Sequence, residues 1–467
     1  MSKKSKTLLA ALGILALLSA AYYGSTVWAK KKAGSASSPY SPSTRLGNLE
    51  SSELVKIEVP GLTLEKEGST WELKLLNGAI PPSGIELDQG QITSLCYSLA
   101  SIWIDSIVDE NPEDLSVYGL ENPYSRAIIT DLNGTKAEYI LGDMTPSRST
   151  YYLMEEGDPK VYSVSAYLAE NINLSLDKIR QKSLFPAFQL NELTRFSMES
   201  EGNSIEIATK PENTPPYLAS IYTSHILTSP YKLPRGVSAE SLRTLLTPFN
   251  NLKVADFIDD NPLSLRTYGL DKPVKILLQT RDKTLDLLIG NEVDEKCYAK
   301  LAGTPGVFTL SGMESIIKTK PFDLADKFVL LVNIDSVSHI EIRGGQKNLS
   351  ADLQHPSNPD EEETFFLNGE KTQTSTFKSF YESIISLMAD AEYPKAPVTA
   401  PAQTTDGDGN ITIEYQLNSP QGERLSITLI PYNRDFYALR QEGVTEFLVS
   451  RNQVSRIFDT ADKIIYE

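Results

Sequence analysis

The chain has 467 residues, which is too long for one ordinary hydrophobic core and predicts about three compact units of roughly 150 residues each. Hydrophobic residues make up 40% of the sequence and charged residues 22%, so a largely disordered chain is excluded. The formal net charge of −17 disfavours nucleic acid and anionic membrane surfaces as partners, and favours solubility, basic partners or divalent cations.

Residues 8–28 form an uncharged, mostly apolar stretch that is long enough, as a helix, to cross a hydrocarbon core of about 30 Å. Three lysines precede this stretch and three follow it, so the positive-inside rule does not decide its orientation. Long domains behind an N-terminal anchor are usually translocated regardless of charge. We therefore predict a cytoplasmic tip and single-pass signal anchor in residues 1–31, a flexible Ser/Gly/Ala/Pro-rich tether in residues 32–44, and an extracytoplasmic body.

A cleavable signal peptide is the alternative to this anchor. Residues 8–21 make an acceptable hydrophobic region, and Val27-Trp28-Ala29 loosely fits a small-residue cleavage site. Without the six lysines of residues 1–32, the formal net charge of the remaining chain is −23. The body is strongly acidic under either interpretation.

One segment of the chain occurs twice. Residues 109–123 and residues 259–273 both contain Asn-Pro followed by Tyr-Gly-Leu, and the register continues to Gly142 and Gly290. Because the register holds across short gaps, one fold unit has been duplicated. A fainter third copy is indicated by three matching segments, which are residues 162–165, 308–311 and 447–450.

Each unit opens with strand-like alternation, continues with a helix and ends in several strands. We predict an α+β fold with three tandem modules, each a mainly antiparallel sheet with one long packed helix and a short linking helix. The predicted boundaries are residues 45–184 for module 1, 185–327 for module 2 and 328–467 for a divergent module 3. The helices are predicted from apolar stripes, which are Ile92, Leu95, Leu99 and Ile102, then Leu242, Leu245, Phe249 and Leu252, then Phe377, Phe380, Ile384 and Leu387.

The duplicated acidic turn is the candidate interaction motif. Its carboxylates suit a cation or a basic partner, but a structural role is favoured, because Asn-Pro fixes a turn, the tyrosine packs as a corner and the glycine adopts a backbone conformation closed to other residues. In module 3, a Pro/Ala/Thr-rich loop at residues 393–410 replaces this turn. The candidate residues are Asp109, Asn111, Pro112, Tyr118, Gly119, Leu120 and Pro123 in module 1, and Asp259, Asn261, Pro262, Tyr268, Gly269, Leu270 and Pro273 in module 2.

The sequence predicts no catalytic residue, no cofactor and no metal site. The three histidines do not form a metal-spaced pair, and the two cysteines, Cys96 and Cys297, lie at different relative positions in different units, so we expect no structural disulfide. The sequence has no nucleophile elbow, phosphate loop or dinucleotide fingerprint.

Residues 406–410 begin like an EF-hand loop. However, Ile411 stands where the sharp-turn glycine is required, and Leu417 stands where the bidentate glutamate is required. A plain Asp/Gly turn that enters a strand is therefore favoured over an irregular calcium loop.

The apolar N-terminal stretch, the repeated Asp/Asn-Pro and Tyr-Gly-Leu-x-x-Pro elements and the strands that end in Leu-Gly or Ile-Gly resemble a bacterial family catalogued as domain of unknown function 4340. The resemblance extends from about Leu46 and is most specific at residues 109–168 and 259–316. It implies a membrane-tethered envelope protein whose relatives are often encoded beside ABC-type transport components of the kind linked to gliding motility. The family supplies no catalytic residues, and module 3 departs from its motif.

Our leading hypothesis is a non-enzymatic accessory or scaffolding protein, tethered to the bacterial cytoplasmic membrane with its body outside the cytoplasm. The expected partner is a protein, with ABC-type transporter subunits as the partner that the resemblance implies; no nucleic acid is expected. The alternatives are an envelope hydrolase with acidic residues in a groove between modules, and a purely structural spacer.

Overall fold

The computed structural model describes residues 45–219, 223–345, 347–356, 363–394, 409–419 and 422–467. The predicted anchor at residues 8–28 and the tether at residues 32–44 lie outside this part of the chain. Among the helices of the described residues, none is long and apolar enough to cross a membrane.

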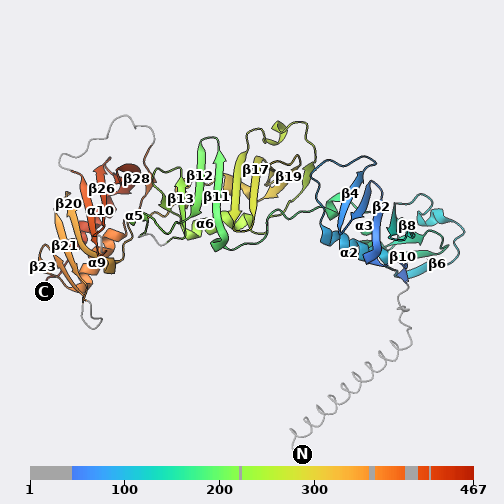
Figure 1. Ribbon diagram of the computed structural model, residues 1–467, viewed down its shortest axis with the longest axis horizontal. Helices are drawn as coiled ribbons and strands as arrows, with labels where there is room; N and C mark the ends of the chain where they lie inside the picture. The colour runs from blue at the N-terminus through green and yellow to red at the C-terminus, as the bar shows by residue number, and fades with distance from the viewer. Residues whose placement is uncertain (1–44, 220–222, 346, 357–362, 395–408, 420–421) are drawn as a thin grey trace, which may run out of the picture. The chain divides into compact units, whose positions relative to one another are not determined.

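Three antiparallel sheets with equivalent strand orders contain almost all of the strands (Figure 1). In each sheet, the first long strand of the module pairs with the strand that follows the module's main helix and crossover. The short strand that precedes this crossover lies at the far edge of the sheet. The α+β fold with repeated sheet modules is thereby confirmed.

Module 1 has the strand order β4-β3-β2-β7-β8-β9-β10-β6, with the buried side of α2 in the same apolar cluster as the sheet. The carboxylate of Asp88 accepts hydrogen bonds from the backbone N–H groups of Gly90 and Gln91 and so caps α2. The strands are β1 (Arg45–Leu46), β2 (Leu54–Val59), β3 (Leu62–Glu67), β4 (Thr70–Leu76), β5 (Ile102–Trp103), β6 (Ser106–Asp109), β7 (Ser125–Asp131), β8 (Lys136–Met144), β9 (Thr150–Glu155) and β10 (Val161–Ser165). The helices are η1 (Ser51–Glu53), α2 (Gln89–Ala100), η2 (Leu115–Tyr118), α3 (Ala166–Ile172) and α4 (Leu176–Ile179).

Module 2 has the order β14-β13-β12-β11-β16-β17-β18-β19-β15. The hydroxyl of Ser238 accepts a hydrogen bond from the backbone N–H of Ser241 and caps α6. The strands are β11 (Leu193–Ser200), β12 (Asn203–Thr209), β13 (His225–Ser229), β14 (Arg235–Gly236), β15 (Phe257–Asp259), β16 (Val274–Thr280), β17 (Thr284–Val293), β18 (Lys296–Leu301) and β19 (Val307–Ser311). The helices are η3 (Leu190–Glu192), α5 (Pro216–Ala219), α6 (Ala239–Leu246), η4 (Thr247–Phe249), η5 (Arg266–Tyr268), α7 (Met313–Ile317) and α8 (Pro321–Leu324).

Module 3 has the order β23-β22-β21-β20-β25-β26-β27-β28-β24. Its last helix differs from the short linking helix that the sequence predicted, because α10 has 11 residues and contacts α9, with the hydroxyls of Ser383 and Thr460 2.9 Å apart. The strands are β20 (Val337–Arg343), β21 (Leu349–Gln354), β22 (Thr364–Leu367), β23 (Glu370–Lys371), β24 (Ala391–Glu392), β25 (Ile411–Leu417), β26 (Arg424–Pro431), β27 (Phe436–Gln441) and β28 (Val444–Ser450). The helices are η6 (Ile334–Ser336), α9 (Thr374–Ile385) and α10 (Arg451–Ala461).

The predicted main helices are shorter than their apolar stripes. Ile102 lies in strand β5, Phe249 lies in the separate 3-10 helix η4, and Leu387 follows the end of α9. Pro248 in η4 has no backbone N–H, so it cannot continue the hydrogen bonding of α6. All of these apolar side chains are nevertheless buried, which is why their spacing reads as one continuous stripe.

Module 1 forms one compact unit, which ends at Gln181, and modules 2 and 3 form a second unit from Lys182 onward. The buried apolar side chains of modules 2 and 3 make one continuous cluster. At the joint between them, the buried guanidinium of Arg235 donates to Gln441 at 2.5 Å, has Glu446 at 3.8 Å and lies 4.6 Å from the ring centroid of Phe447. The hydroxyl of Tyr231 donates to Glu392 at 2.6 Å. These contacts fix module 3 to module 2.

Candidate functional site

The Asp-Asn-Pro turn closes on its own tyrosine in both copies. In module 1, one oxygen of the Asp109 carboxylate accepts from the backbone N–H of Asn111 at 3.0 Å, and the other accepts from the hydroxyl of Tyr118 at 2.8 Å. In module 2, Asp259 accepts from the N–H of Asn261 at 3.0 Å and from the hydroxyl of Tyr268 at 3.1 Å. The repeated aspartate is thus engaged inside the turn.

The Tyr-Gly-Leu step packs this turn onto the sheet. Gly119 has φ +67°, and a Cβ there would lie 2.4 Å from the carboxyl carbon of Asp143. Gly269 has φ +70°, and a Cβ there would lie 2.2 Å from the side-chain oxygen of Asn291. Only glycine combines a left-handed conformation with so close an approach. The leucine that follows each glycine is buried; these residues are Leu120 and Leu270.

The tyrosine of each turn rests against a second tyrosine of the sheet. The rings of Tyr118 and Tyr152 are 5.1 Å apart and edge to face, and the rings of Tyr268 and Tyr298 repeat this arrangement at 5.1 Å. Edge-to-face pairs of this kind stabilise a contact beyond the apolar area that they bury. Together with the hydrogen bonds to aspartate, they hold the turn as a rigid corner.

The remaining motif residues are exposed or half-buried. Asn111 and Asn261 are exposed, whereas Pro112 and Pro262 are half-buried in the same loops. Pro123 and Pro273, also half-buried, stand just before strands β7 and β16, where a fixed φ sets the entry of the strand.

Apolar side chains are exposed beside both corners. In module 1, Val108 in the edge strand β6 is 41% exposed and Val117 in η2 is 69% exposed. In module 2, Ile258 in the edge strand β15 is 44% exposed and Leu263 in the loop is fully exposed. Among the described residues, β6 pairs only with β10, and β15 pairs only with β19, so each strand has one edge without a strand partner. Edge strands with apolar side chains are suited to pairing with another chain.

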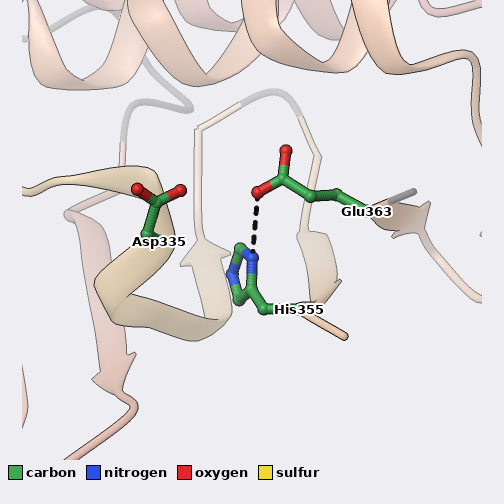
Figure 2. Close-up of side chains that lie close together, drawn as sticks. All are labelled: Asp335, His355 and Glu363. Carbon is green, nitrogen blue, oxygen red and sulfur yellow. Dashed lines mark hydrogen bonds and ion pairs between the residues drawn. The ribbon is translucent and has the colours of Figure 1, made fainter. Parts of the chain in front are cut away.

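A second constellation lies in module 3, where the sheet register brings together Asp335, His355 and Glu363. Strands β21 and β22 pair Gln354 with Thr364, so His355 and Glu363 are the next neighbours beyond the last pair. Helix η6 carries Asp335 and leads directly into β20, the neighbour of β21. Figure 2 shows the three side chains converging from these three segments. One potential ligand atom from each residue lies within 4.8 Å of the other two.

Hydrogen bonds orient two of these three side chains. The Nε2 atom of His355 lies 2.9 Å from the backbone carbonyl of Val337, and the Nδ1 atom lies 3.2 Å from Oε1 of Glu363. The other oxygen of Glu363 is 3.0 Å from the ammonium of Lys378. This ammonium, and then the contact with His355, hold the pKa of the Glu363 carboxyl below its ordinary value despite partial burial. A carboxylate and an imidazole in this arrangement are ordinary ligands for a divalent metal ion.

Lys378 also links this constellation to a pocket. The pocket has a volume of about 400 Å³ and is lined by apolar side chains that include Val332, Ile334 and Ile385, together with the hydroxyl-bearing ring of Tyr381. The Tyr381 hydroxyl donates to the carbonyl of Val332 at 2.8 Å, which makes one wall rigid. Lys378 is thus both a lining residue of this pocket and the ion-pair partner of Glu363.

Sequence reasoning did not find the constellation of Asp335, His355 and Glu363. The residues have no spacing that is typical of a metal motif, and only the register of β20, β21 and β22 makes them neighbours. The one signal in the sequence is that His355 and Glu363 stand at the two ends of a short acidic segment, residues 355–363. For the EF-hand-like loop, residues 406–408 lie outside the described residues, and Asn410 leads directly into β25.

Comparison with protein families gives one match. The family model described as a domain of unknown function (DUF4340) matches residues 79–225 and 226–403, which together are more than half of the chain. Each matched segment contains one of the two Tyr-Gly-Leu corners. A comparison with curated proteins finds no match. The chain therefore belongs to the DUF4340 family, which is the family that its repeated motif resembles.

Proposed function

We propose that this protein is a non-enzymatic scaffold, tethered to the bacterial cytoplasmic membrane by residues 8–28, whose extracytoplasmic modules bind a protein partner. The observation that carries the proposal is the repeated corner with exposed apolar side chains beside it. In both copies the aspartate, the tyrosine and the glycine make the corner rigid. Val117 in module 1 and Leu263 in module 2 remain exposed. Rigid presentation of apolar side chains lowers the entropic cost of binding.

ABC-type transporter subunits are the first partner to test, because the family resemblance implies a genomic neighbourhood with such components. The proposed mode is contact of a partner segment with the corners and the adjacent edge strands β6 and β15. A strand added to such an edge gains backbone hydrogen bonds, and the exposed side chains give specificity.

The carboxylates at the joint between modules 2 and 3 support the hydrolase alternative less well than the scaffold. Glu446 accepts from the backbone N–H of Lys232 at 2.5 Å, and Glu392 accepts from Tyr231. These acids are engaged with residues of the neighbouring module, so they are poorly suited to act as general acid and base. The same joint supports the spacer alternative, which requires rigid order of modules without partner contact.

Site-specific photocrosslinking in cells separates these functions. A photoreactive residue is placed at Val117, and a matched control is placed at Leu132, which is 68% exposed against 69% for Val117 but lies in the turn between β7 and β8. We expect a discrete crosslinked protein from position 117, and from Leu263, but not from position 132. Equal crosslinking at all three positions, or none at any, would refute partner binding at the corners and would favour the spacer.

A further inference from the structure

We propose that Asp335, His355 and Glu363 form a binding site for one zinc-class divalent metal ion in module 3. This inference is independent of the proposed scaffold function, because it rests on the ligand geometry of one module. The three side chains supply one imidazole nitrogen and two carboxylates, a donor set that suits Zn²⁺ and similar borderline ions better than Mg²⁺ or Ca²⁺.

The hydrogen bond of His355 to the backbone indicates its tautomer. A backbone carbonyl only accepts hydrogen bonds, so Nε2, at 2.9 Å from the carbonyl of Val337, carries a hydrogen and donates it. In the neutral ring, Nδ1 then has a free lone pair. Anchoring of one ring nitrogen by a backbone carbonyl, with the other on the metal, is the usual outer arrangement of a metal-bound histidine.

Module 2 contains an internal comparison for this histidine. His225 places its Nε2 at 3.1 Å from the carbonyl of Leu193, the first residue of β11, as His355 does with Val337, the first residue of β20. The Nδ1 atom of His225 lies 2.9 Å from the hydroxyl of Ser224, which can donate a hydrogen to its lone pair. His225 is therefore satisfied without any ligand.

At His355 the partner of Nδ1 is different in kind. The Oε1 atom of Glu363 lies 3.2 Å away, and an ionised carboxylate has no hydrogen to donate. Either a proton on Nδ1 or a metal ion shared by the two atoms can bridge them at this distance. Two ligand atoms on one tetrahedral Zn²⁺ ion lie about 3.3 Å apart, given metal–ligand distances of about 2.0–2.1 Å, so the separation fits a shared ion.

The contacts that Glu363 and Asp335 make with neighbouring side chains leave an oxygen of each carboxylate available to a metal ion. Lys378 pairs with Oε2 of Glu363, so Oε1 is the atom that faces the histidine. Asp335 is exposed, and its carboxylate makes one long contact within the described residues, at 3.4 Å with the side-chain amide of Asn333. Rotation of this exposed carboxylate completes three ligands, and the fourth position of the ion stays open to water.

The test is titration of the untagged full-length protein, purified in detergent and stripped of metal, with Co²⁺ and Zn²⁺. Bound Co²⁺ is followed by its visible absorption and Zn²⁺ by calorimetry. We expect one ion per chain, with affinity at least about tenfold weaker in Asp335→Asn, Glu363→Gln and His355→Gln. Asp335→Asn is the least disruptive of these variants, because the residue is exposed, so its effect does not depend on misfolding.

His339→Gln is the matched control. The Nδ1 atom of His339 lies 2.8 Å from a carboxylate oxygen of Asp352, and within the described residues this histidine–carboxylate pair has no third ligand nearby. We expect this variant to bind the metal like the wild type. Absence of stoichiometric Zn²⁺ binding would overturn the site and show that a proton alone bridges His355 and Glu363. Binding unaffected by the three substitutions, or equally tight binding of Ca²⁺ and Mg²⁺, would also overturn it.

Discussion

The close approach between the Tyr-Gly-Leu corner and the sheet predicts that Gly142→Ala strongly destabilises module 1. Gly142 lies in β8, and a Cβ there would be 2.2 Å from the backbone carbonyl oxygen of Tyr118, whereas ordinary contacts begin near 3.4 Å. The corner must therefore move by more than an ångström. Tyr118 resists this movement because it is held by Asp109 and by the ring of Tyr152. Overpacking of this kind lowers the free energy of unfolding by about 2–3 kcal/mol.

Native thiols provide the assay. Cys96 is buried in α2 of the first compact unit, and Cys297 is buried in β18 of the second. Labelling by a thiol reagent is expected to follow unfolding of each unit. If the free energy of unfolding of the first unit falls by about 2–3 kcal/mol, labelling of Cys96 is then about 30- to 150-fold faster. The labelling rate of Cys297 should be unchanged. Labelled peptides are quantified by mass spectrometry on the full-length protein.

Two further variants control this experiment. Gly134 has φ +81°, and a Cβ added there would meet no other atom within 4 Å, so Gly134→Ala introduces backbone strain alone, which costs about 1 kcal/mol. Gly290→Ala repeats the clash in module 2, where the Cβ would lie 2.1 Å from the carbonyl oxygen of Tyr268, and should accelerate labelling of Cys297 instead of Cys96. If Gly142→Ala labels Cys96 no faster than Gly134→Ala does, the reasoning about the corner is refuted.

Three other outcomes follow from buried groups. Arg235→Met at the joint should lower the free energy of unfolding by about 3 kcal/mol and increase hydrogen exchange in β14 and β28. The control variant Arg195→Met removes a surface ion pair and should change neither quantity. Equal effects of the two variants would argue against a buried joint. Burial raises the pKa of the Glu155 carboxyl above 4.5, so its charge destabilises the fold increasingly as pH rises from 4.5 through the raised pKa. Glu155→Gln should therefore raise the urea midpoint of module 1, followed by tryptophan fluorescence, near neutral pH but not well below pH 4.5; a gain that is equal at both pH values would contradict this assignment. Burial raises the pKa of both thiols to about 11, so Cys96 and Cys297 should resist alkylation in the native protein and react on unfolding; rapid alkylation of either native thiol would show that its unit opens readily.

The candidate sites divide by whether their contacts are local in the chain. The hydrogen bonds of the corner join residues at most nine apart, with glycine, proline and aspartate at turn positions, so its motif residues were identifiable in the sequence, whereas the tyrosines of the sheet that pack against it were not. The site at Asp335, His355 and Glu363 depends on the pairing of three strands, and a one-residue slip of register would separate its members. Apart from His355 and Glu363 at the two ends of an acidic segment, its residues carry no local signal.

The sequence by itself determined the repeat and the α+β class, because these depend on internal similarity and on the periodicity of apolar residues. The sequence predicted main helices that are longer than the observed ones. Phe249 and Leu387 are buried although they lie beyond the ends of α6 and α9, so they continue the apolar spacing of each helix. Only the tertiary structure decided that modules 2 and 3 share one core and that Arg235 of module 2 is buried against Gln441 of module 3. Such contacts join residues that are distant in the chain, and no periodic pattern of apolar residues specifies them.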